Sequence, residues 1–183
     1  MRHNQVHGPD TILATLHTAG TFSDPMLLVD VENSDVLLTL RTGENTAGHP
    51  SWTHGGFTSL LMDEMAGQAY AEFLQPARGP GMTANLTVNY TAPLPTEADL
   101  LVTAGLERVE GRKVWLHLEV RDGPPVVCQW PGSGDDDGDS DSDDSDDDDD
   151  GEGKGSDACG EGSDGGGTVY ATGTALFIVL AKD

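Results

Sequence analysis

Apolar and polar residues alternate in several stretches of the chain, which is the spacing of strands that bury one face. Two short stretches, residues 25–31 and 35–41, come first. Four longer ones follow at residues 82–91, 100–106, 113–121 and 169–179, with a tight hairpin turn at Glu110-Gly111 between the second and the third. The predicted apolar face is Met82, Ala84, Leu86, Val88 and Tyr90 in the first of these four, and Val169, Ala171, Gly173, Ala175, Phe177 and Val179 in the last.

One long helix is predicted from Gly55 to about Gln75. Its apolar stripe recurs at helical spacing and consists of Met62, Met65, Ala66, Ala69 and Phe73. Its solvated edge would consist of Glu64, Gln68 and Glu72. Pro76 is expected to end the helix. A short helix within Asp10–Gly20 and a loop over Thr42–Thr53 complete the expected elements.

The order of these elements predicts an α+β fold. A single long helix cannot cover both faces of a parallel sheet, whereas an antiparallel sheet that wraps around one helix buries the apolar faces of both. We expect residues 1–24 to form an N-terminal segment, and residues 25–130 and 168–183 to form one domain.

The segment from residue 131 to 167 differs in composition from the rest of the chain. It holds 14 Asp and 2 Glu against 1 Lys, a net charge of −15, and only Ala158 and Cys159 are apolar. Such a segment cannot bury enough surface to offset the entropy of ordering it, so we predict a disordered acidic insertion between the last two strands. It leaves −8 of the total charge of −23 on the rest of the chain.

Charge and cysteine usage narrow the classes of partner. Neither part of the chain has the basic surface that binds nucleic acid, and no apolar run is as long as a membrane span. Two cysteines, Cys128 and Cys159, are too few for a disulfide framework, and the six histidines show no metal-ligand spacing. The N-terminal residues do not resemble a signal peptide. We expect an intracellular protein without a cofactor or metal, cytoplasmic, with a mitochondrial location left open.

The start of the long helix carries the clearest chemical pattern, His54-Gly55-Gly56. The first amides of a helix have no partner within the helix, and they lie at the positive end of its dipole. Glycines there let a ligand oxygen approach closely, which suits a carbonyl that develops negative charge. Asp63 is the only acid in the first two turns.

His54 and Asp63 are nine residues apart, roughly 13 Å along a helix and on opposite sides of it. One copy of the helix therefore cannot bring both to one reacting atom. Two antiparallel copies can, if Gly55 of one faces Asp63 of the other. A working site at this motif predicts a dimer or a larger assembly of such pairs.

These motifs resemble the acyl-CoA thioesterases of the hot-dog fold, in the phenylacetate-type branch. The resemblance covers roughly residues 43–179 without the acidic segment. It is carried by His54-Gly55-Gly56 with Asp63 nine residues on, and then by Met82–Pro95, Arg108–Lys113 and Val169–Phe177. It implies hydrolysis of acyl thioesters of coenzyme A on a hot-dog fold.

The resemblance also implies roles for single residues. The amide of Gly55 would stabilise the oxyanion, and Asp63 of the partner subunit would act as base or nucleophile. Thr83 would assist from the next strand, and Asn45 would hold the water. Residues expected to bind the substrate are Gly56, Arg108, Arg112 and Lys113, the last three at the coenzyme A phosphates; exposed hairpin charges remain the alternative for these three.

Two alternatives stay open at this point. A hot-dog dehydratase or hydratase would use His54 as a proton shuttle beside a carboxylate. An inactive hot-dog dimer would instead use its acidic insertion to bind a basic protein.

Deletion of residues 131–167, with a short Gly-containing turn in their place, is expected to leave stability and kcat nearly unchanged. The segment offers almost nothing to a core, and its charge is screened beyond about 8 Å at physiological salt. KM for acyl-CoA should stay equal or fall slightly, most visibly at low salt, and any binding of a basic protein should disappear. A large loss of kcat or of folding would show that the segment is structural.

Overall fold

The computed structural model describes residues 2–4, 12–18, 20–124 and 167–180. The acidic segment up to residue 166 lies outside the described residues, so the prediction that it is disordered stays a prediction. Within them, every strand pairing is antiparallel, and seven strands form one sheet in the order β1-β2-β3-β7-β8-β9-β6. These strands are β1 (Arg2–Asn4), β2 (Phe22–Asp30), β3 (Asp35–Thr42), β6 (Gly81–Tyr90), β7 (Asp99–Glu110), β8 (Lys113–Asp122) and β9 (Val169–Val179).

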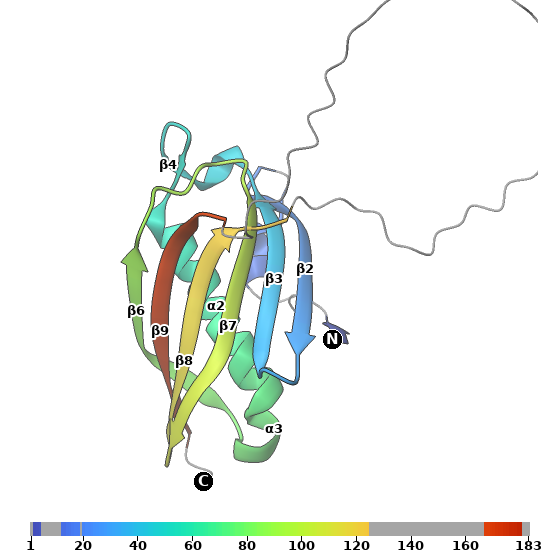
Figure 1. Cartoon of the computed structure of the whole chain (residues 1–183), viewed down its shortest axis with the longest axis vertical. Helices are drawn as coiled ribbons and strands as arrows, with labels where there is room; N and C mark the ends of the chain where they lie inside the picture. Colours follow the sequence, from blue (N-terminus) through green and yellow to red (C-terminus); the bar gives the residue numbers. More distant parts are fainter. Residues whose placement is uncertain (1, 5–11, 19, 125–166, 181–183) are drawn as a thin grey trace, which may run out of the picture. The chain divides into compact units, whose positions relative to one another are not determined.

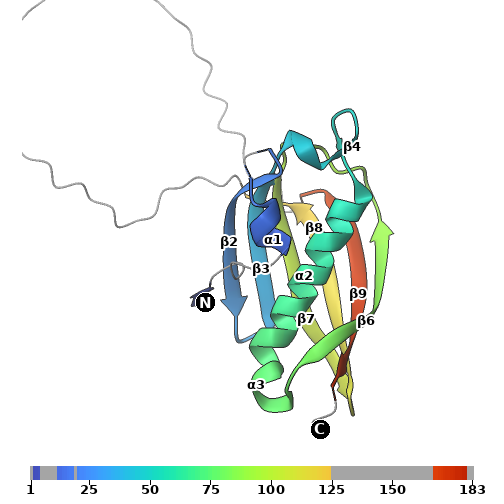
Figure 2. The ribbon, with the colours of Figure 1, turned by 180° about the vertical axis from the view of Figure 1, so that it is seen from behind.

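Helix α2 (Gly55–Phe73) runs across one face of this sheet, as Figure 2 shows, with the shorter α1 (Ile12–Leu16) beside it. In the opposite view the sheet lies in front of the helix (Figure 1). The predicted architecture, one antiparallel sheet against one long helix, is therefore confirmed.

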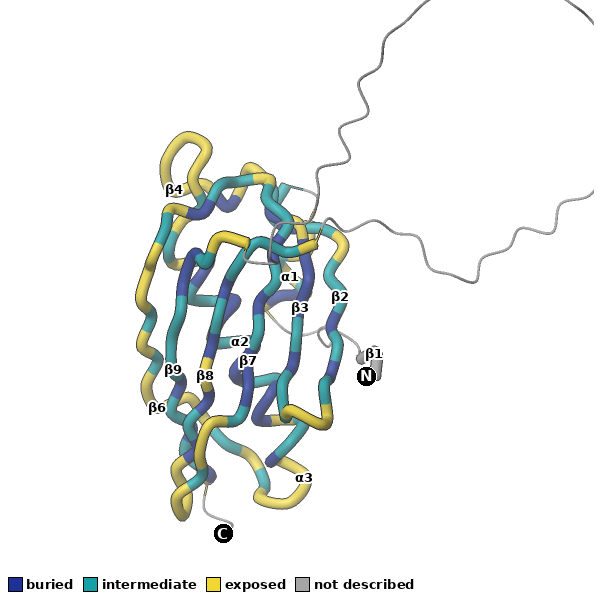
Figure 3. The backbone as a smooth tube through the Cα atoms, viewed as in Figure 1, coloured by how far each residue is buried: buried dark blue, intermediate teal, exposed yellow. Residues whose placement is uncertain are grey.

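The core lies between α2 and the sheet. Met62, Met65, Ala66 and Ala69 are buried as predicted, and the dark segments of Figure 3 mark the buried positions of the sheet. Phe73 at the helix end is only partly buried. The edge predicted to be solvated is instead half-buried, at Glu64, Gln68 and Glu72. Burial, with Asp63 next in the chain, raises the pKa of Glu64.

The helix ends differ in detail from the prediction. Pro76 does not simply stop the chain, because the short helix α3 (Gln75–Arg78) follows α2 and holds Pro76 in its first turn, where no amide is needed. Gly79 then turns the chain with a φ of 85°, a conformation that favours glycine.

The predicted loop before α2 contains regular structure. Residues 44–46 form the 3₁₀ helix η1 (Glu44–Thr46), and a small hairpin follows, made of β4 (Ala47–His49) and β5 (Trp52–Thr53). Ser51 in its turn has a φ of 67°. The polar composition that predicted a loop is also that of a short exposed hairpin.

A β-bulge in β6 overturns the predicted face only at the start of that strand, whereas Leu86 and Val88 pack against the core as predicted. Thr83 pairs with Phe177 and Asn85 with Leu176, so Ala84 is an extra residue. Phe177 is buried against the helix, and Thr83 therefore points to the helix side. Met82 lies on the opposite face and is 61% exposed. A strict alternation of two cannot hold across an inserted residue.

A second bulge changes β9 in the same way. Ala171 pairs with Val120 and Val169 with Arg121, which leaves Tyr170 as the extra residue. Tyr170 and Ala171 are consecutive and both buried, whereas Val169, predicted on the apolar face, is only half-buried. The bulge thus aims a tyrosine into the interior that the sequence pattern placed outside.

Strand β6 is one edge of the sheet, and among the described residues it pairs only with β9. Most of its residues are exposed, as the yellow and teal stretches of β6 in Figure 3 show. Its outer row of backbone groups has no partner strand in the described part of the chain. An exposed edge of this length is a template for pairing with another strand.

Gly173→Ala is expected to lower the free energy of unfolding by about 1–3 kcal/mol, as overpacked positions do. Its new Cβ would lie 2.4 Å from the Thr87 backbone O and 2.8 Å from Met62 Cε, so β6 or α2 must move. The matched control is Gly67→Ala on α2, where nothing lies within 4 Å of the new Cβ. Gly67→Ala should raise the free energy of unfolding by about 0.5–1 kcal/mol, because alanine has a higher helix propensity than glycine. Urea unfolding measures both, and equal stability of Gly173→Ala and wild type would contradict this packing.

Candidate active site

His54 caps the N-terminus of α2. Its Nδ1 accepts a hydrogen bond of 2.8 Å from the Gly56 amide, and its own amide donates to Thr46 O at 2.7 Å. Gly56 was expected to bind substrate, but its N–H donates to the His54 ring instead. Within the described residues the Gly55 N–H has no hydrogen-bond partner, so it is the amide of this helix end that remains for a ligand.

Tyr90 and Ser59 surround Gly55, and sequence reasoning missed both. Tyr90 Oη donates to Gly55 O at 2.9 Å and lies 2.6 Å from Ser59 Oγ. A Cβ on Gly55 would meet the Tyr90 ring at 3.2 Å. The aromatic end of β6 therefore packs directly on the first turn of α2. The tyrosine stood in the strand pattern, but nothing in its spacing tied it to the glycine.

A pocket of about 330 Å³ lies beside Gly55 and reaches into the protein. Its lining carries no charged side chain and consists of Thr53, Gly55, Thr58, Tyr90, Thr91, Ala92, Pro93, Leu94 and Tyr170. A second hollow also borders Gly55 and shares Thr53 with the first. It lies against the β4–β5 hairpin and is lined by Gly48, His49, Trp52, Thr53, His54 and Gly55.

Tyr170 in the first pocket is held by a carboxylate. Its Oη donates to Asp122 Oδ1, and Asp122 Oδ2 accepts from the Thr168 amide at 2.8 Å. The hydrogen bond from the phenol lowers the pKa of Asp122. Burial, together with this carboxylate, raises the pKa of Tyr170 to about 12, so the phenol is neutral at physiological pH.

Asp63 lies in a different hollow. Its Oδ1 accepts a hydrogen bond of 2.9 Å from Thr83 Oγ1, the contact that the bulge in β6 makes possible. The residues around it include Gly67, Met82 and Phe177, and none of them borders Gly55. Gly55 and Asp63 are eight residues apart on one unbroken helix, about 12 Å along its axis. One chain brings Thr83 to Asp63, but it does not bring Gly55 to either.

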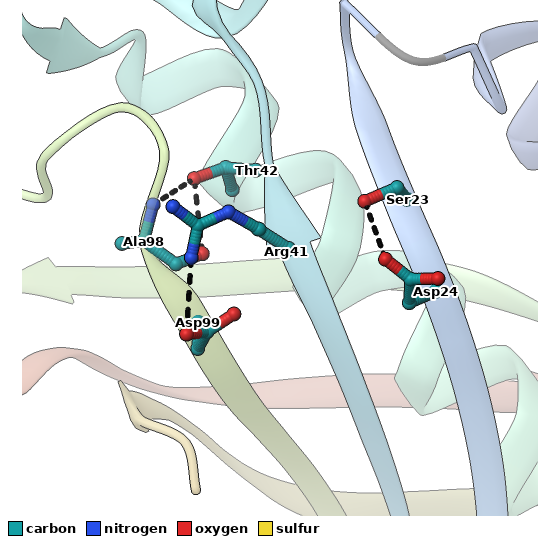
Figure 4. A network of polar contacts seen from close by, with 6 residues as sticks. All are labelled: Ser23, Asp24, Arg41, Thr42, Ala98 and Asp99. Atoms are coloured by element: carbon teal, nitrogen blue, oxygen red, sulfur yellow. Dashed lines mark hydrogen bonds and ion pairs between the residues drawn. The ribbon is translucent and has the colours of Figure 1, made fainter. Parts of the chain in front are cut away.

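Asn45, which was expected to hold the water, lies in η1. Its backbone N–H donates a hydrogen bond of 2.6 Å to Gly20 O. It lines a polar hollow that contains neither His54 nor Gly55. Figure 4 shows the polar contacts beside this hollow: Arg41 Nη1 donates to Asp99 Oδ2 at 3.1 Å, and Thr42 and Ala98 exchange two hydrogen bonds. The structure does not bring Asn45 into the Gly55 pocket.

The three predicted phosphate ligands lie at the β7–β8 hairpin, and both Figure 1 and Figure 2 place this hairpin at the opposite end of the sheet from the start of α2. Arg108 stacks 3.9 Å above the Trp115 ring and pairs with Glu110 at 3.2 Å. Arg112 Nε donates to Val179 O at 2.9 Å. Lys113 is exposed. Arg78 joins this corner, with Nη1 2.9 Å from Gly111 O, and was not predicted.

The described residues offer neither a metal-binding cluster nor a membrane-spanning helix. No group of three or more His, Cys, Asp or Glu side chains is placed to hold a metal ion there. No helix in the described part is long and apolar enough to span a membrane.

Comparison with known proteins places this geometry in a family context. A model of the thioesterase superfamily matches residues 52–129, from the β4–β5 hairpin through β8. Acyl-coenzyme A thioesterase THEM4 of Xenopus laevis is 38% identical over 79 residues, which are 43% of this chain and 34% of that protein. The predicted resemblance to the hot-dog thioesterases is confirmed. The chain spans about a third of the length of this curated relative.

Structural similarity extends over nearly the whole chain. The phenylacetic acid degradation-related thioesterase of Ralstonia eutropha JMP134 has a TM-score of 0.57 at 16% identity, and the match covers 95% of this chain and 96% of that one. At this identity the likeness establishes the hot-dog fold. An uncharacterized Candida albicans protein, named as mitochondrial, is 27% identical over 92 residues, half of this chain and 40% of its own length.

His54→Ala is expected to lower the free energy of unfolding by about 1 kcal/mol, because the helix loses its N-cap acceptor. His54→Asn should retain most of the stability, since asparagine is among the best N-cap residues. Chemical denaturation of the two variants and wild type measures the difference. Equal destabilisation by Ala and Asn would mean that the hydrogen bond to the Gly56 amide contributes nothing.

Proposed function

We propose that this protein hydrolyses acyl-CoA thioesters to a free acid and coenzyme A, in a site shared between two copies of the chain. The observation that carries the proposal is the free Gly55 amide at the positive end of α2, together with the Thr83–Asp63 hydrogen bond. The relatives with matching sequences, named acyl-coenzyme A thioesterases, support the substrate class.

The proposed chemistry uses these groups in turn. The Gly55 N–H donates to the thioester oxygen as it gains negative charge, and the dipole of α2 adds to this stabilisation. Asp63 takes a proton from water, whose oxygen adds to the carbonyl carbon, or its carboxylate attacks that carbon directly. In the first route the C–S bond then breaks, and the thiolate of coenzyme A takes up the proton that Asp63 removed from water. In the second route the C–S bond breaks as the thiolate leaves and takes a proton from solvent, and water then hydrolyses the mixed anhydride to the free acid and the Asp63 carboxylate. Thr83 holds Asp63 in one orientation.

His54 has a positioning role in this proposal. Its Nδ1 is occupied by the Gly56 amide, so the ring fixes the first turn and keeps the Gly55 amide directed outward. A dehydratase or hydratase needs a histidine that is free to shuttle a proton beside a carboxylate. Because the His54 ring is engaged as the cap of α2, this geometry favours the hydrolase.

The free edge of β6 supplies a way to join two copies. Tyr90 on this strand contacts Gly55, and Thr83, seven residues earlier, contacts Asp63. Antiparallel pairing of β6 with a second β6, centred between Leu86 and Thr87, places Tyr90 of one copy opposite Thr83 of the other. Gly55 then lies beside Asp63 of the second copy. The proposed dimer would contain two such sites, and a tetramer would pair two dimers.

The basic corner is proposed to bind the coenzyme A phosphates. Arg108, Arg112 and Lys113 lie toward the end of the sheet where α2 ends, and Arg78 adds a fourth cation. In the shared site this corner belongs to the copy that provides Asp63. In this proposal, the basic corner of one copy and the Gly55 amide of the other copy would bind the same substrate molecule.

Asp63→Asn is expected to lower kcat by roughly 10²-fold or more, the usual effect of losing a general base or nucleophile. The amide keeps the size of the side chain and can still accept from Thr83, so thermal unfolding should change little. Glu72→Gln, further along α2, is the matched control and should keep kcat within a few-fold. Release of coenzyme A thiol measures turnover, and near-normal turnover of Asp63→Asn would exclude this residue from the mechanism.

Mixing two inactive variants tests whether the site is shared. Gly55→Pro removes the oxyanion donor, and proline is tolerated at the first helical position. His54 already has the extended ψ of 131° that a residue before proline adopts. In a heterodimer of Gly55→Pro with Asp63→Asn, one of the two sites combines a wild-type Gly55 with a wild-type Asp63. Such heterodimers should therefore recover up to about half of the activity of a wild-type dimer. Well-formed heterodimers without recovery would show that both groups act within one chain.

A further inference from the structure

The innermost residues of the pocket beside Gly55 are Thr58, Leu94 and Tyr170, which are 2%, 5% and 7% exposed. These three side chains form the buried wall of the pocket, whereas Tyr90, Thr91 and Pro93 on its lining are exposed. Thr58 belongs to α2, Leu94 to the segment after β6, and Tyr170 to the start of β9.

Tyr170 is held rigidly in this wall. The bulge in β9 turns its side chain inward, and Asp122 accepts its hydroxyl proton from the neighbouring strand. Its backbone O accepts from the amides of Thr91 and Ala92 at 2.9 and 3.3 Å. The same residue thus forms one wall and fixes the backbone of the facing wall. Bulges near sites of chemistry commonly aim a side chain in this way.

The two hollows at Gly55 differ in which part of a thioester they can take. The coenzyme A arm carries phosphates, which need solvent or cations. Neither hollow is lined by Asp, Glu, Lys or Arg, but only the pocket that holds Tyr170 has a buried wall. The hollow at the β4–β5 hairpin is open, because Trp52 and His54 are exposed. A thioester whose oxygen meets the Gly55 amide therefore directs its acyl group toward Tyr170 and its arm outward.

We propose that Tyr170 is a specificity-determining residue whose ring closes the acyl end of the site and restricts the enzyme to short acyl groups. The proposal rests on the thioesterase function proposed above. The pocket volume of about 330 Å³ supports it, because small-molecule pockets range from roughly 300 to 1,000 Å³. The neutral phenol suits an uncharged acyl group.

The test is the chain-length profile of kcat/KM with acetyl-, butanoyl-, octanoyl-, dodecanoyl- and palmitoyl-CoA. Wild type is expected to lose activity beyond the short acyl groups. Tyr170→Ala should raise kcat/KM at least tenfold for the first substrate that wild type rejects, since each methylene that becomes buried contributes about fourfold. Tyr170→Phe keeps the ring and loses only the Asp122 hydrogen bond, so it should retain the wild-type limit.

A change in the facing wall tests the same idea from the other side. Ala92→Leu narrows the pocket and should shift the limit to shorter chains, which keeps the proposal testable if Tyr170→Ala fails to fold. Active enzymes whose chain-length profiles do not differ between wild type, Tyr170→Ala and Ala92→Leu would overturn the role of Tyr170 and leave the thioesterase function standing.

Binding separates the two proposals if wild type hydrolyses none of the esters. In that case the proposed function fails, and calorimetry with the S-butyl and S-dodecyl thioethers of coenzyme A measures the pocket directly. Tyr170→Ala should then bind the dodecyl thioether at least tenfold more tightly than wild type and the butyl thioether no more tightly. Equal affinities of both proteins for the dodecyl thioether would overturn the role of Tyr170 as well.

Discussion

Helix α2 packs its Met and Ala side chains against one face of the sheet, and this contact fixes where both ends of the helix lie. Each large apolar side chain buried there contributes roughly 1.5–3 kcal/mol relative to exposure. Gly173 marks a close approach, with Met62 Cε in the space that a Cβ would need. Because the helix cannot slide without loss of this packing, Gly55 and Asp63 are held at fixed positions about 12 Å apart.

The strand at the sheet edge is tied to both positions. Thr83 binds the Asp63 carboxylate, eight residues beyond Gly55, and Tyr90 binds the first turn of the helix. Both contacts are made by side chains of β6, whose outer edge has no partner in the described residues. The helix alone separates the two candidate groups, and the strand that carries their contacts is the one available for pairing. The proposed shared site follows from these two facts together.

Irregular positions in the strands place most of the candidate site. The bulge at Ala84 turns Thr83 to Asp63, and the bulge at Tyr170 turns that ring to the pocket beside Gly55. A third irregularity, between Leu106 and Arg108, accompanies the stacking of Arg108 on Trp115. Regular strands would carry the apolar core equally well. Bulges conflict with simple alternation, and here they coincide with residues of chemical interest.

The sequence by itself determined the antiparallel sheet, the single long helix and the glycine-rich start of that helix. These features depend on local periodicity and on backbone freedom, both of which can be read along the chain. Only the tertiary structure decided that His54 takes the Gly56 amide, that Asn45 lies in a separate hollow, and that Tyr170 lines the pocket. The His54 contact is local, but the ring could take several partners and the sequence does not say which. The places of Asn45 and Tyr170 depend on how segments far apart in sequence meet, and one inserted residue, as in β9, changes which side chains of a strand face the core.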